Sequence, residues 1–269
     1  MSNAIQRLLG RLSGKPRDSY KKTVKARRLP EAQYQALPAL KCRVWYNEYG
    51  GYCLPESSLH RTAPRKVLRA KVYEPDTIAF MREHCGGGDV VHAGTYFGDF
   101  LPGVASALDP GCTLWAFEPN RENYRCANIT TLINDLDNVQ LTNAGLGQQR
   151  ETLWFRTRDA DGTPLGGKSH VVAAAASNSS TDDRVDIVTI DDTVPPDRPV
   201  SIIQLDVEDH EKAALTGALG TIKRCRPIII LEVRKGSELL ESDWFRETIL
   251  QLGYRPTAQV HGNTVFEPV

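Results

Sequence analysis

Apolar residues in this chain gather in short continuous runs that predict buried strands. Six such runs follow one another, at residues 88–93, 112–118, 138–143, 185–190, 201–206 and 227–232. Helical segments are predicted around them, at 75–85, 99–108, 120–136, 208–224 and 243–252. Continuously apolar strands that alternate with helices are typical of a mostly parallel sheet covered on both faces.

Cap and turn residues add detail to this pattern. Pro75 stands in a first helical turn, where its missing N–H does no harm, and Asn120 is a good N-cap. Two antiparallel hairpins are also predicted, at 151–157 with 169–174 and at 254–260 with 263–267.

The chain divides into three predicted parts. Residues 1–40 form a basic N-terminal extension, 41–74 a lead-in segment that packs on the core, and 75–269 an α/β domain. The lead-in is rich in Trp and Tyr, and we expect these rings to pack over an edge of the sheet. An aromatic platform for a substrate ring is the alternative.

The most distinctive stretch is Val90-Val91-His92-Ala93-Gly94-Thr95-Tyr96-Phe97-Gly98-Asp99. It predicts a buried strand that breaks into a glycine turn and opens a helix. A ligand can approach such a turn closely, because a Cβ there would collide with it, and the helix start points free N–H groups at the same spot. The next strand ends in Glu118, whose carboxylate can accept both hydroxyls of a ribose. These features predict a nucleoside-binding crevice.

Ligands of such sheets bind beyond the carboxyl ends of the strands. Polar groups or a turn glycine recur at these ends, namely His92 with Gly94, Glu118, Asn143, Asp206 and Glu232. This recurrence favours a binding site over chance. The dinucleotide fingerprint GxGxxG is incomplete, since three residues separate Gly94 from Gly98 and no third glycine follows in register. The pattern therefore favours S-adenosylmethionine over NAD.

Four blocks of sequence follow one another in a specific order: Val91 to Asp99, Phe117-Glu118-Pro119, Ile203 to Glu211 with Leu215-x-Gly217-Ala218, and Arg226 to Glu232. Together they resemble the FkbM-type S-adenosylmethionine-dependent methyltransferases, over residues 75–267. The resemblance implies a doubly wound, Rossmann-like class I methyltransferase fold, with a seven-stranded, mostly parallel sheet whose last strand is antiparallel. It also implies O-methylation, typically of sugar or polyketide hydroxyls.

The resemblance further implies roles for single residues. Gly94, Thr95 and Gly98 would hold the methionyl part of the cofactor, and His92 and Tyr96 belong to the same turn. Glu118 would bind the ribose, Asn143 and Ala144 would border the adenine, and Asp206 would lie under the sulfonium. Two departures stand out, since the family usually has an acid in place of His92 and a glycine in place of Asp209.

Methyl transfer to an alcohol needs positioning and the loss of the hydroxyl proton. His210, Glu208 and Asp206 are the candidate bases. A divalent metal could instead lower the hydroxyl pKa, with oxygen ligands from Asp206, Glu208 and Glu232. Acids at this spacing are also typical of helix capping, so metal dependence stays open. His261 and Asn263 lie in the last hairpin, which could fold over the acceptor or only form a tight turn.

The net charge of zero is unevenly distributed. Residues 1–30 hold nine Lys/Arg and one acid, a net +8, so the remainder carries −8. Such an arm is either solvated or a surface for anionic lipid, an acidic protein or nucleic acid. Ile5, Leu8, Leu9 and Leu12 fall at helical spacing, so an amphipathic helix could contact a membrane, a partner or a second subunit.

Six cysteines without CxxC spacing indicate free thiols in a reducing cytosol. No run approaches the ~20 apolar residues of a membrane span, and the start lacks the apolar block of a secretory signal. We therefore expect a cytoplasmic protein. The neutral-to-acidic main domain argues against nucleic-acid substrates.

These observations predict an S-adenosylmethionine-dependent O-methyltransferase with S-adenosylhomocysteine as product. The acceptor would be a sugar, a glycan or another hydroxylated biosynthetic intermediate. Two alternatives stay open. An NAD(P)-linked oxidoreductase would need a YxxxK-like centre, which we do not find. A non-catalytic binding protein on a methyltransferase fold is favoured by His92 and Asp209.

Overall fold

A computed structural model describes residues 39–178, 180–233 and 236–269. The chain divides into one unit of Met1–Ala39 and a second of Leu40–Val269, and the fold below is that of the second unit. The predicted basic arm and its amphipathic helix lie outside the described residues. No described helix has both the length and the apolar character needed to cross a bilayer.

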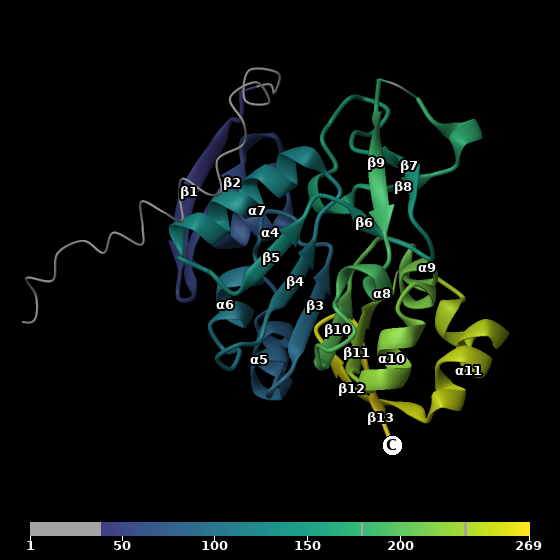
Figure 1. Ribbon diagram of the computed structural model, residues 1–269. Coiled ribbons are helices and arrows are strands. Elements are labelled where there is room, and N and C mark those ends of the chain that lie inside the picture. Colours follow the sequence, from purple (N-terminus) through teal and green to yellow (C-terminus); the bar gives the residue numbers. More distant parts are fainter. Residues whose placement is uncertain (1–38, 179, 234–235) are drawn as a thin grey trace, which may run out of the picture. The chain divides into compact units, whose positions relative to one another are not determined.

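The centre of this unit is a seven-stranded sheet in the order β12-β13-β11-β10-β3-β4-β5 (Figure 1). The pairs from β11 to β5 are parallel, whereas β13 runs antiparallel to both of its neighbours. This order confirms the predicted class I arrangement with its antiparallel last strand. The strands are β3 (Asp89–Ala93), β4 (Leu114–Phe117), β5 (Val139–Thr142), β10 (Val200–Leu205), β11 (Ile228–Glu232), β12 (Tyr254–Val260) and β13 (Asn263–Pro268).

Helices cover both faces of the sheet and create two cores (Figure 1). In β10, Ile202 points into the core shared with α5, α6 and α7, whereas Ile203 and Leu205 point into the core shared with α8 to α11. This alternation explains why the strand is apolar throughout. The helices are α5 (Pro75–His84), α6 (Leu101–Ala105), α7 (Arg121–Ile133), α8 (Ile190–Thr193), α9 (Glu211–Thr216), α10 (Leu219–Cys225) and α11 (Asp243–Thr248).

Several predicted helices are shorter or broken in the structure. The helix expected at 208–224 is split into α9 and α10, with Gly217 between them. Only glycine fits there, because a Cβ would lie 2.0 Å from the backbone oxygen of Gly147. The helix expected at 99–108 begins only at Leu101, since Gly98 still has the left-handed φ of the turn, +87°. The cap at Asn120 is confirmed, because its side chain accepts the N–H groups of Glu122 and Asn123.

A second sheet of four strands, in the order β6-β9-β7-β8, is inserted between β5 and β10. The strand predicted at 185–190 is confirmed as part of β9, which lies in this second sheet and ends at Val188. The predicted hairpin is confirmed as the antiparallel pair β7–β8. The elements are β6 (Gly145–Leu146), β7 (Glu151–Arg156), β8 (His170–Val172) and β9 (Asp182–Val188), with short 3₁₀ turns η2 (Gly166–Lys168) and η3 (Ala174–Ala176), and later η4 (Leu239–Glu241) and η5 (Leu250–Leu252).

The lead-in segment forms an antiparallel hairpin followed by a short helix. It comprises β1 (Cys42–Asn47), β2 (Gly50–Pro55), η1 (Glu56–Ser58) and α4 (Thr62–Val67). The hairpin is joined to α7, because the Cys53 N–H donates to Thr130 Oγ1 at 3.0 Å. The expected burial of aromatic rings holds for Tyr52 and is wrong for Trp45 and Tyr46, which are exposed.

All six cysteines are free thiols, as predicted. Three that are far apart in sequence nevertheless meet, since Cys53 forms hydrogen bonds with Cys42 and Cys126. These bonds lower the pKa of Cys53 to about 7. The thiols thus link the β1–β2 hairpin to α7.

Candidate active site

The turn after β3 brings its backbone against the end of β10. Gly94 has φ +88°, and a Cβ added there would lie 1.9 Å from the backbone oxygen of Asp206. Glycine is therefore required at this position. Tyr96 has a left-handed φ of 52°, which is rare for a side-chain-bearing residue. Two hydrogen bonds hold it, because its N–H donates to Glu118 at 2.7 Å and its hydroxyl to Ser58 at 2.6 Å.

Glu118, at the end of β4, is a buried carboxyl held by backbone groups. Its Oε2 accepts the Tyr96 N–H, and its Oε1 accepts the Asn120 N–H at 2.8 Å. Burial nevertheless raises the pKa of Glu118 to about 8, although these N–H groups act in the opposite direction. Oε1 also accepts a long hydrogen bond from Asn123 Nδ2 at 3.5 Å, so Oε2 is the oxygen that retains more capacity for a ligand hydroxyl.

Asp206, just after β10, is held in a different way. It shares a hydrogen bond with Glu232 at the end of β11. Burial and the negative charges of Glu232 and Glu208 raise the pKa of Asp206 well above its usual range. Like charges at close range disfavour double ionisation, so this pair retains a proton more readily than isolated acids do.

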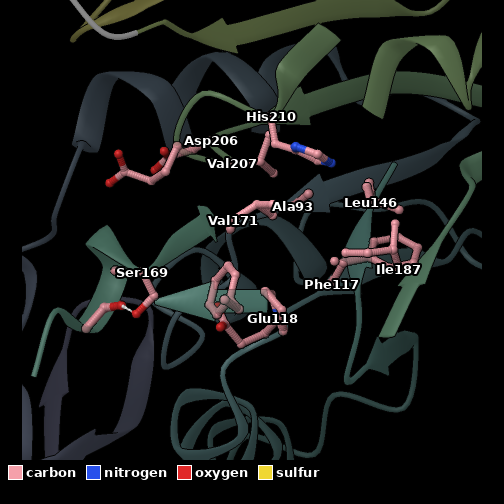
Figure 2. A pocket seen from close by; sticks show the side chains of 17 residues that line it. Ala93, Phe117, Glu118, Leu146, Ser169, Val171, Ile187, Asp206, Val207 and His210 are labelled. Atoms are coloured by element: carbon pink, nitrogen blue, oxygen red, sulfur yellow. Dashed lines mark hydrogen bonds between the residues drawn. The ribbon is translucent and has the colours of Figure 1, made fainter. Parts of the chain in front are cut away.

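These groups border an open pocket between the main sheet and the inserted sheet (Figure 2). One wall is apolar and is made by Leu146, Phe155, Val171 and Ile187. The acids Glu118, Asp206 and Glu208 line other parts of the same pocket.

The sequence interpretation missed the contribution of the inserted sheet. Its side chains Phe155, Val171 and Ile187 line the pocket, as do Gly166, Gly167 and Ser169 of the β7–β8 connection. The start of α7 holds this connection, because Asn123 Nδ2 donates to the Gly166 carbonyl at 3.3 Å and Asn120 Nδ2 to Ser169 Oγ at 3.4 Å. The apolar face of the predicted hairpin was the one sequence feature that could have indicated this contribution to the pocket.

A second group of residues lies beside the Asp206–Glu232 pair. Tyr73 contacts His261 edge-on, with ring centroids 6.1 Å apart. The negative charges of Glu74, Asp99, Glu232 and Asp206, added to burial, raise the pKa of Tyr73. A Cβ on Gly262 would lie 4.0 Å from Glu232 Oε1. The last hairpin therefore does lie next to the acids, as one of the two sequence interpretations required.

Comparison with known proteins shows to which family the chain belongs. The sequence profile described as "Methyltransferase FkbM domain" matches residues 92–256, more than half of the chain. The chain belongs to the FkbM methyltransferase family. A comparison with curated protein sequences finds no match.

Solved structures that resemble this FkbM chain are distant from it. An FkbM methyltransferase from Methylobacillus flagellatus KT is 18% identical (TM-score 0.46) over 67% of this chain and 43% of that one. M. jannaschii TYW2, solved with AdoMet, is 11% identical (TM-score 0.46) over 87% and 89%. A SAM-dependent methyltransferase from Aquifex aeolicus is 15% identical (TM-score 0.40) over 73% and 89%. This chain thus spans less than half the length of the Methylobacillus protein.

The structure brings only some of the predicted site residues of this FkbM chain to the pocket. Gly94, Glu118, Asp206, Glu208 and His210 line it. His92, Thr95, Tyr96, Gly98, Asn143 and Ala144 do not belong to the residues lining it. Asn143 has a supporting position, because its Nδ2 donates to the backbone oxygens of Glu118 at 2.8 Å and Pro119 at 3.2 Å. Tyr96 supports the site through its hydrogen bond to Glu118.

His92, the first of the two expected departures from the family pattern, is buried in β3. Its Nδ1 hydrogen-bonds Gln204 of β10, and its ring stacks on Phe100 with centroids 5.0 Å apart. Burial lowers the pKa of His92 to about 4, so the ring is neutral at pH 7. Its Nε2 is buried without a hydrogen-bond partner among the described residues.

Asp209, the second expected departure, lies in a turn whose backbone conformation favours glycine. Asp209 has φ 74° and Glu208 before it has φ 53°, so the turn after β10 passes through the left-handed region twice. Aspartate tolerates this region better than most residues, although glycine does so without strain. With Asp209 at this position, the turn presents Glu208 to the pocket.

His210 and Asp206 lie at different parts of the pocket. Figure 2 shows the His210 ring directed toward Leu146 and Ile187, away from the Asp206 carboxyl. Burial lowers the pKa of His210 below its ordinary value. For the predicted metal alternative, no three His, Cys, Asp or Glu side chains within the described ranges are arranged to hold an ion.

Proposed function

We propose that this chain is an S-adenosylmethionine-dependent O-methyltransferase whose acceptor is a hydroxyl of a sugar, a glycan or another small biosynthetic intermediate. The pocket carries this proposal, because it combines an apolar wall, a ribose-type acid and a second acid within one volume. Adenine, ribose and a sulfonium cation need these three environments. Gly94 lets the turn after β3 lie against the Asp206 backbone, so both residues border this pocket.

The chemistry of each pocket residue suits a different part of the cofactor. The apolar side chains Phe155, Val171 and Ile187 suit the adenine ring. Glu118 has the acceptor capacity for the ribose hydroxyls, and Asp206 places negative charge near the sulfonium. When bound, S-adenosylmethionine supplies an electrophilic methyl group and leaves as S-adenosylhomocysteine. His210 borders the adenine side, so we do not assign it the role of base.

Asp206 is the base that we propose for the acceptor hydroxyl. A general base needs a pKa above that of an ordinary carboxyl, and burial together with the charges of Glu232 and Glu208 raises the pKa of Asp206. The hydroxyl proton passes to the carboxylate of this pair as the acceptor oxygen is positioned for attack. Positioning supplies most of the rate, since methyl transfer is an in-line displacement.

The surroundings of the acid pair favour an uncharged acceptor. Four acids, Glu74, Asp99, Asp206 and Glu232, lie around Tyr73, and an acidic cluster of this kind favours a neutral acceptor over an anionic one. Carboxylates accept hydrogen bonds from hydroxyls, and the rings of Tyr73 and His261 give an apolar border. A neutral polyhydroxylated molecule fits this combination.

Calorimetric titration tests the cofactor, and a product assay tests the reaction. We expect S-adenosylhomocysteine to bind in the micromolar range and NADH not to bind. We also expect S-adenosylhomocysteine release from S-adenosylmethionine with neutral glycosides in an acceptor panel. Binding of NADH without S-adenosylhomocysteine would support the oxidoreductase alternative. Cofactor binding without product from any acceptor would support the non-catalytic alternative.

A further inference from the structure

The connection between β7 and β8 closes one side of the pocket. Its residues 164–169, which we call the strap, include the 3₁₀ turn η2. Three residues of the strap line the pocket, namely Gly166, Gly167 and Ser169. Figure 2 shows Ser169 on the side of the pocket where Glu118 lies. Because the strap is short and irregular, contacts from other elements decide where it lies.

The ring of Tyr96 packs directly against the strap. A Cβ on Gly166 would lie 2.7 Å from Tyr96 Oη, and a Cβ on Gly167 would lie 3.3 Å from Tyr96 Cδ1. Gly166 also has a left-handed φ of +59°. Glycine therefore lets the strap backbone lie on the ring. The hydroxyl end of the ring is fixed in turn, because Tyr96 Oη donates to Ser58 Oγ at 2.6 Å.

The groups that hold Glu118 also hold the strap. Three residues donate hydrogen bonds to Glu118 and contact the strap, namely Tyr96, Asn120 and Asn123. Asn123 Nδ2 donates to the Gly166 carbonyl at 3.3 Å, and Asn120 Nδ2 donates to Ser169 Oγ at 3.4 Å. The strap and the Glu118 carboxyl are therefore positioned by one connected network.

The lead-in segment contacts this network from outside the main sheet. Ser58 is the last residue of η1 and is fully buried, and Arg61 directly precedes α4. The Arg61 N–H donates to the Ser58 carbonyl at 2.9 Å, so the two residues belong to one turn. Arg61 Nη2 donates to the carbonyl of Pro164, the first residue of the strap, at 2.9 Å. This turn thus contacts the strap directly at Pro164 and through the Tyr96 ring at Gly166.

We propose that Ser58 and Arg61 are positioning residues for the cofactor, which hold the strap and the Tyr96–Glu118 contact in the arrangement that binds S-adenosylmethionine. The inference rests on the proposed function of the pocket. Both residues precede the stretch 92–256 that the FkbM profile matches. The lead-in segment would therefore complete the binding site.

Preorganisation is the physical reason to expect an effect on affinity. A segment that is already held in its binding position costs less to order when the ligand binds. A purely structural role predicts something different. Loss of the contacts would then lower the melting temperature, while the protein that stays folded would bind its ligand with unchanged affinity.

Calorimetric titration of the full chain with S-adenosylhomocysteine separates the two roles. Ser58→Ala and Arg61→Gln should each weaken binding about fivefold, the loss expected for one hydrogen bond. The two changes together should weaken binding more than either alone. Hydrogen exchange should be faster in the strap of the free variants, and bound S-adenosylhomocysteine should slow exchange in the strap of the wild type.

Tyr96→Phe gives a second test that removes only one hydroxyl. It should weaken binding about as much as Ser58→Ala, because both changes remove the same hydrogen bond. The Ser58→Ala, Tyr96→Phe double variant should therefore bind no more weakly than either single variant. The Tyr96 N–H lowers the pKa of Glu118, so a less firmly held Tyr96 should raise this pKa. Affinity should then level off at a higher pH than in the wild type.

Two neighbouring residues provide matched controls. Ser57→Ala removes a hydroxyl that donates to Glu122 at 2.7 Å and not to the strap network. Arg65→Gln removes an exposed cation from α4. Both variants should bind S-adenosylhomocysteine as the wild type does, and circular dichroism checks that every variant folds.

The outcomes distinguish this inference from the proposed function. Wild-type affinity in Ser58→Ala and Arg61→Gln overturns the inference and leaves the proposed cofactor standing. So does an equal loss of affinity in Ser57→Ala and Arg65→Gln, because the effect would then not be specific to the strap network. Failure of the wild type to bind S-adenosylhomocysteine overturns the proposed function itself.

Discussion

The two sides of the pocket hold a buried carboxyl in opposite ways. On the β4 side, Glu118 is held by the backbone N–H groups of Tyr96 and Asn120. On the β10 side, Asp206 is held by the side chain of another acid, Glu232. Backbone N–H groups hold a carboxylate in one position, where it can accept hydrogen bonds from a ligand. A carboxyl pair, in contrast, can gain or lose a proton with little change in its geometry. The first arrangement suits binding and the second suits proton transfer.

Asp206→Asn tests the proton-transfer side and is the substitution for which we expect the largest effect. The amide cannot take a proton, so we expect the turnover number to fall by about 10²–10⁴-fold. Cofactor affinity should change far less, since the neighbouring Glu232 still carries charge near the pocket. Steady-state kinetics and calorimetry on the same variant separate the two effects.

Asp109→Asn is the matched control for this change, because Asp109 is exposed and does not line the pocket. It should leave turnover unchanged. Wild-type turnover in the Asp206→Asn variant would remove that residue from the reaction.

The two sides of the pocket also differ in how many of their residues could be predicted from the sequence. The Gly94 turn and Glu118 were predictable, because a glycine break after an apolar strand and an acid at the next strand end are local signals. The Asp206–Glu232 pair was predictable as two strand ends, since parallel strands align their carboxyl ends. Their shared hydrogen bond was not predictable, because it depends on the register of β10 with β11.

The apolar wall and the helix breaks could not be predicted from the sequence, because both depend on tertiary contacts. Phe155 and Ile187 lie in strands in which apolar and polar residues alternate as in any half-buried strand. This local pattern does not predict that the inserted sheet packs against the pocket. The close approach of Gly217 to Gly147, seventy residues earlier, is likewise a tertiary contact that no local pattern predicts. His210 was a plausible base by position alone, and only the direction of its ring separates it from Asp206.

Glu118→Ala tests the binding side of the comparison. Loss of a charge-assisted pair of hydrogen bonds to the ribose should weaken S-adenosylhomocysteine binding by about 1–3 kcal/mol. Turnover at saturating cofactor should fall less than in Asp206→Asn. Calorimetry gives the affinity, and Glu247→Gln, an exposed acid away from the pocket, is the control. An unchanged affinity would move the ribose to another part of the pocket.

The smallest effect that we predict is the pH dependence of cofactor affinity. Burial raises the pKa of Glu118 to about 8 in the free protein, so the group is mostly protonated at pH 7. Ribose hydroxyls donate to the ionised form, and binding therefore lowers the pKa and releases a proton. Affinity should rise as the pH increases from 6 and level off above about 8. Titrations at pH 7 in buffers of different ionisation enthalpy should register this proton.

Glu118→Gln separates this linkage from that of the acid pair. The amide has no proton to lose in this range, so the part of the pH dependence due to Glu118 should vanish, while any contribution from Asp206 remains. Protons released by the variant should therefore be fewer than by the wild type at pH 7. Equal release by both would mean that the proton comes from the Asp206–Glu232 pair, and the division between a binding side and a proton-transfer side would fail.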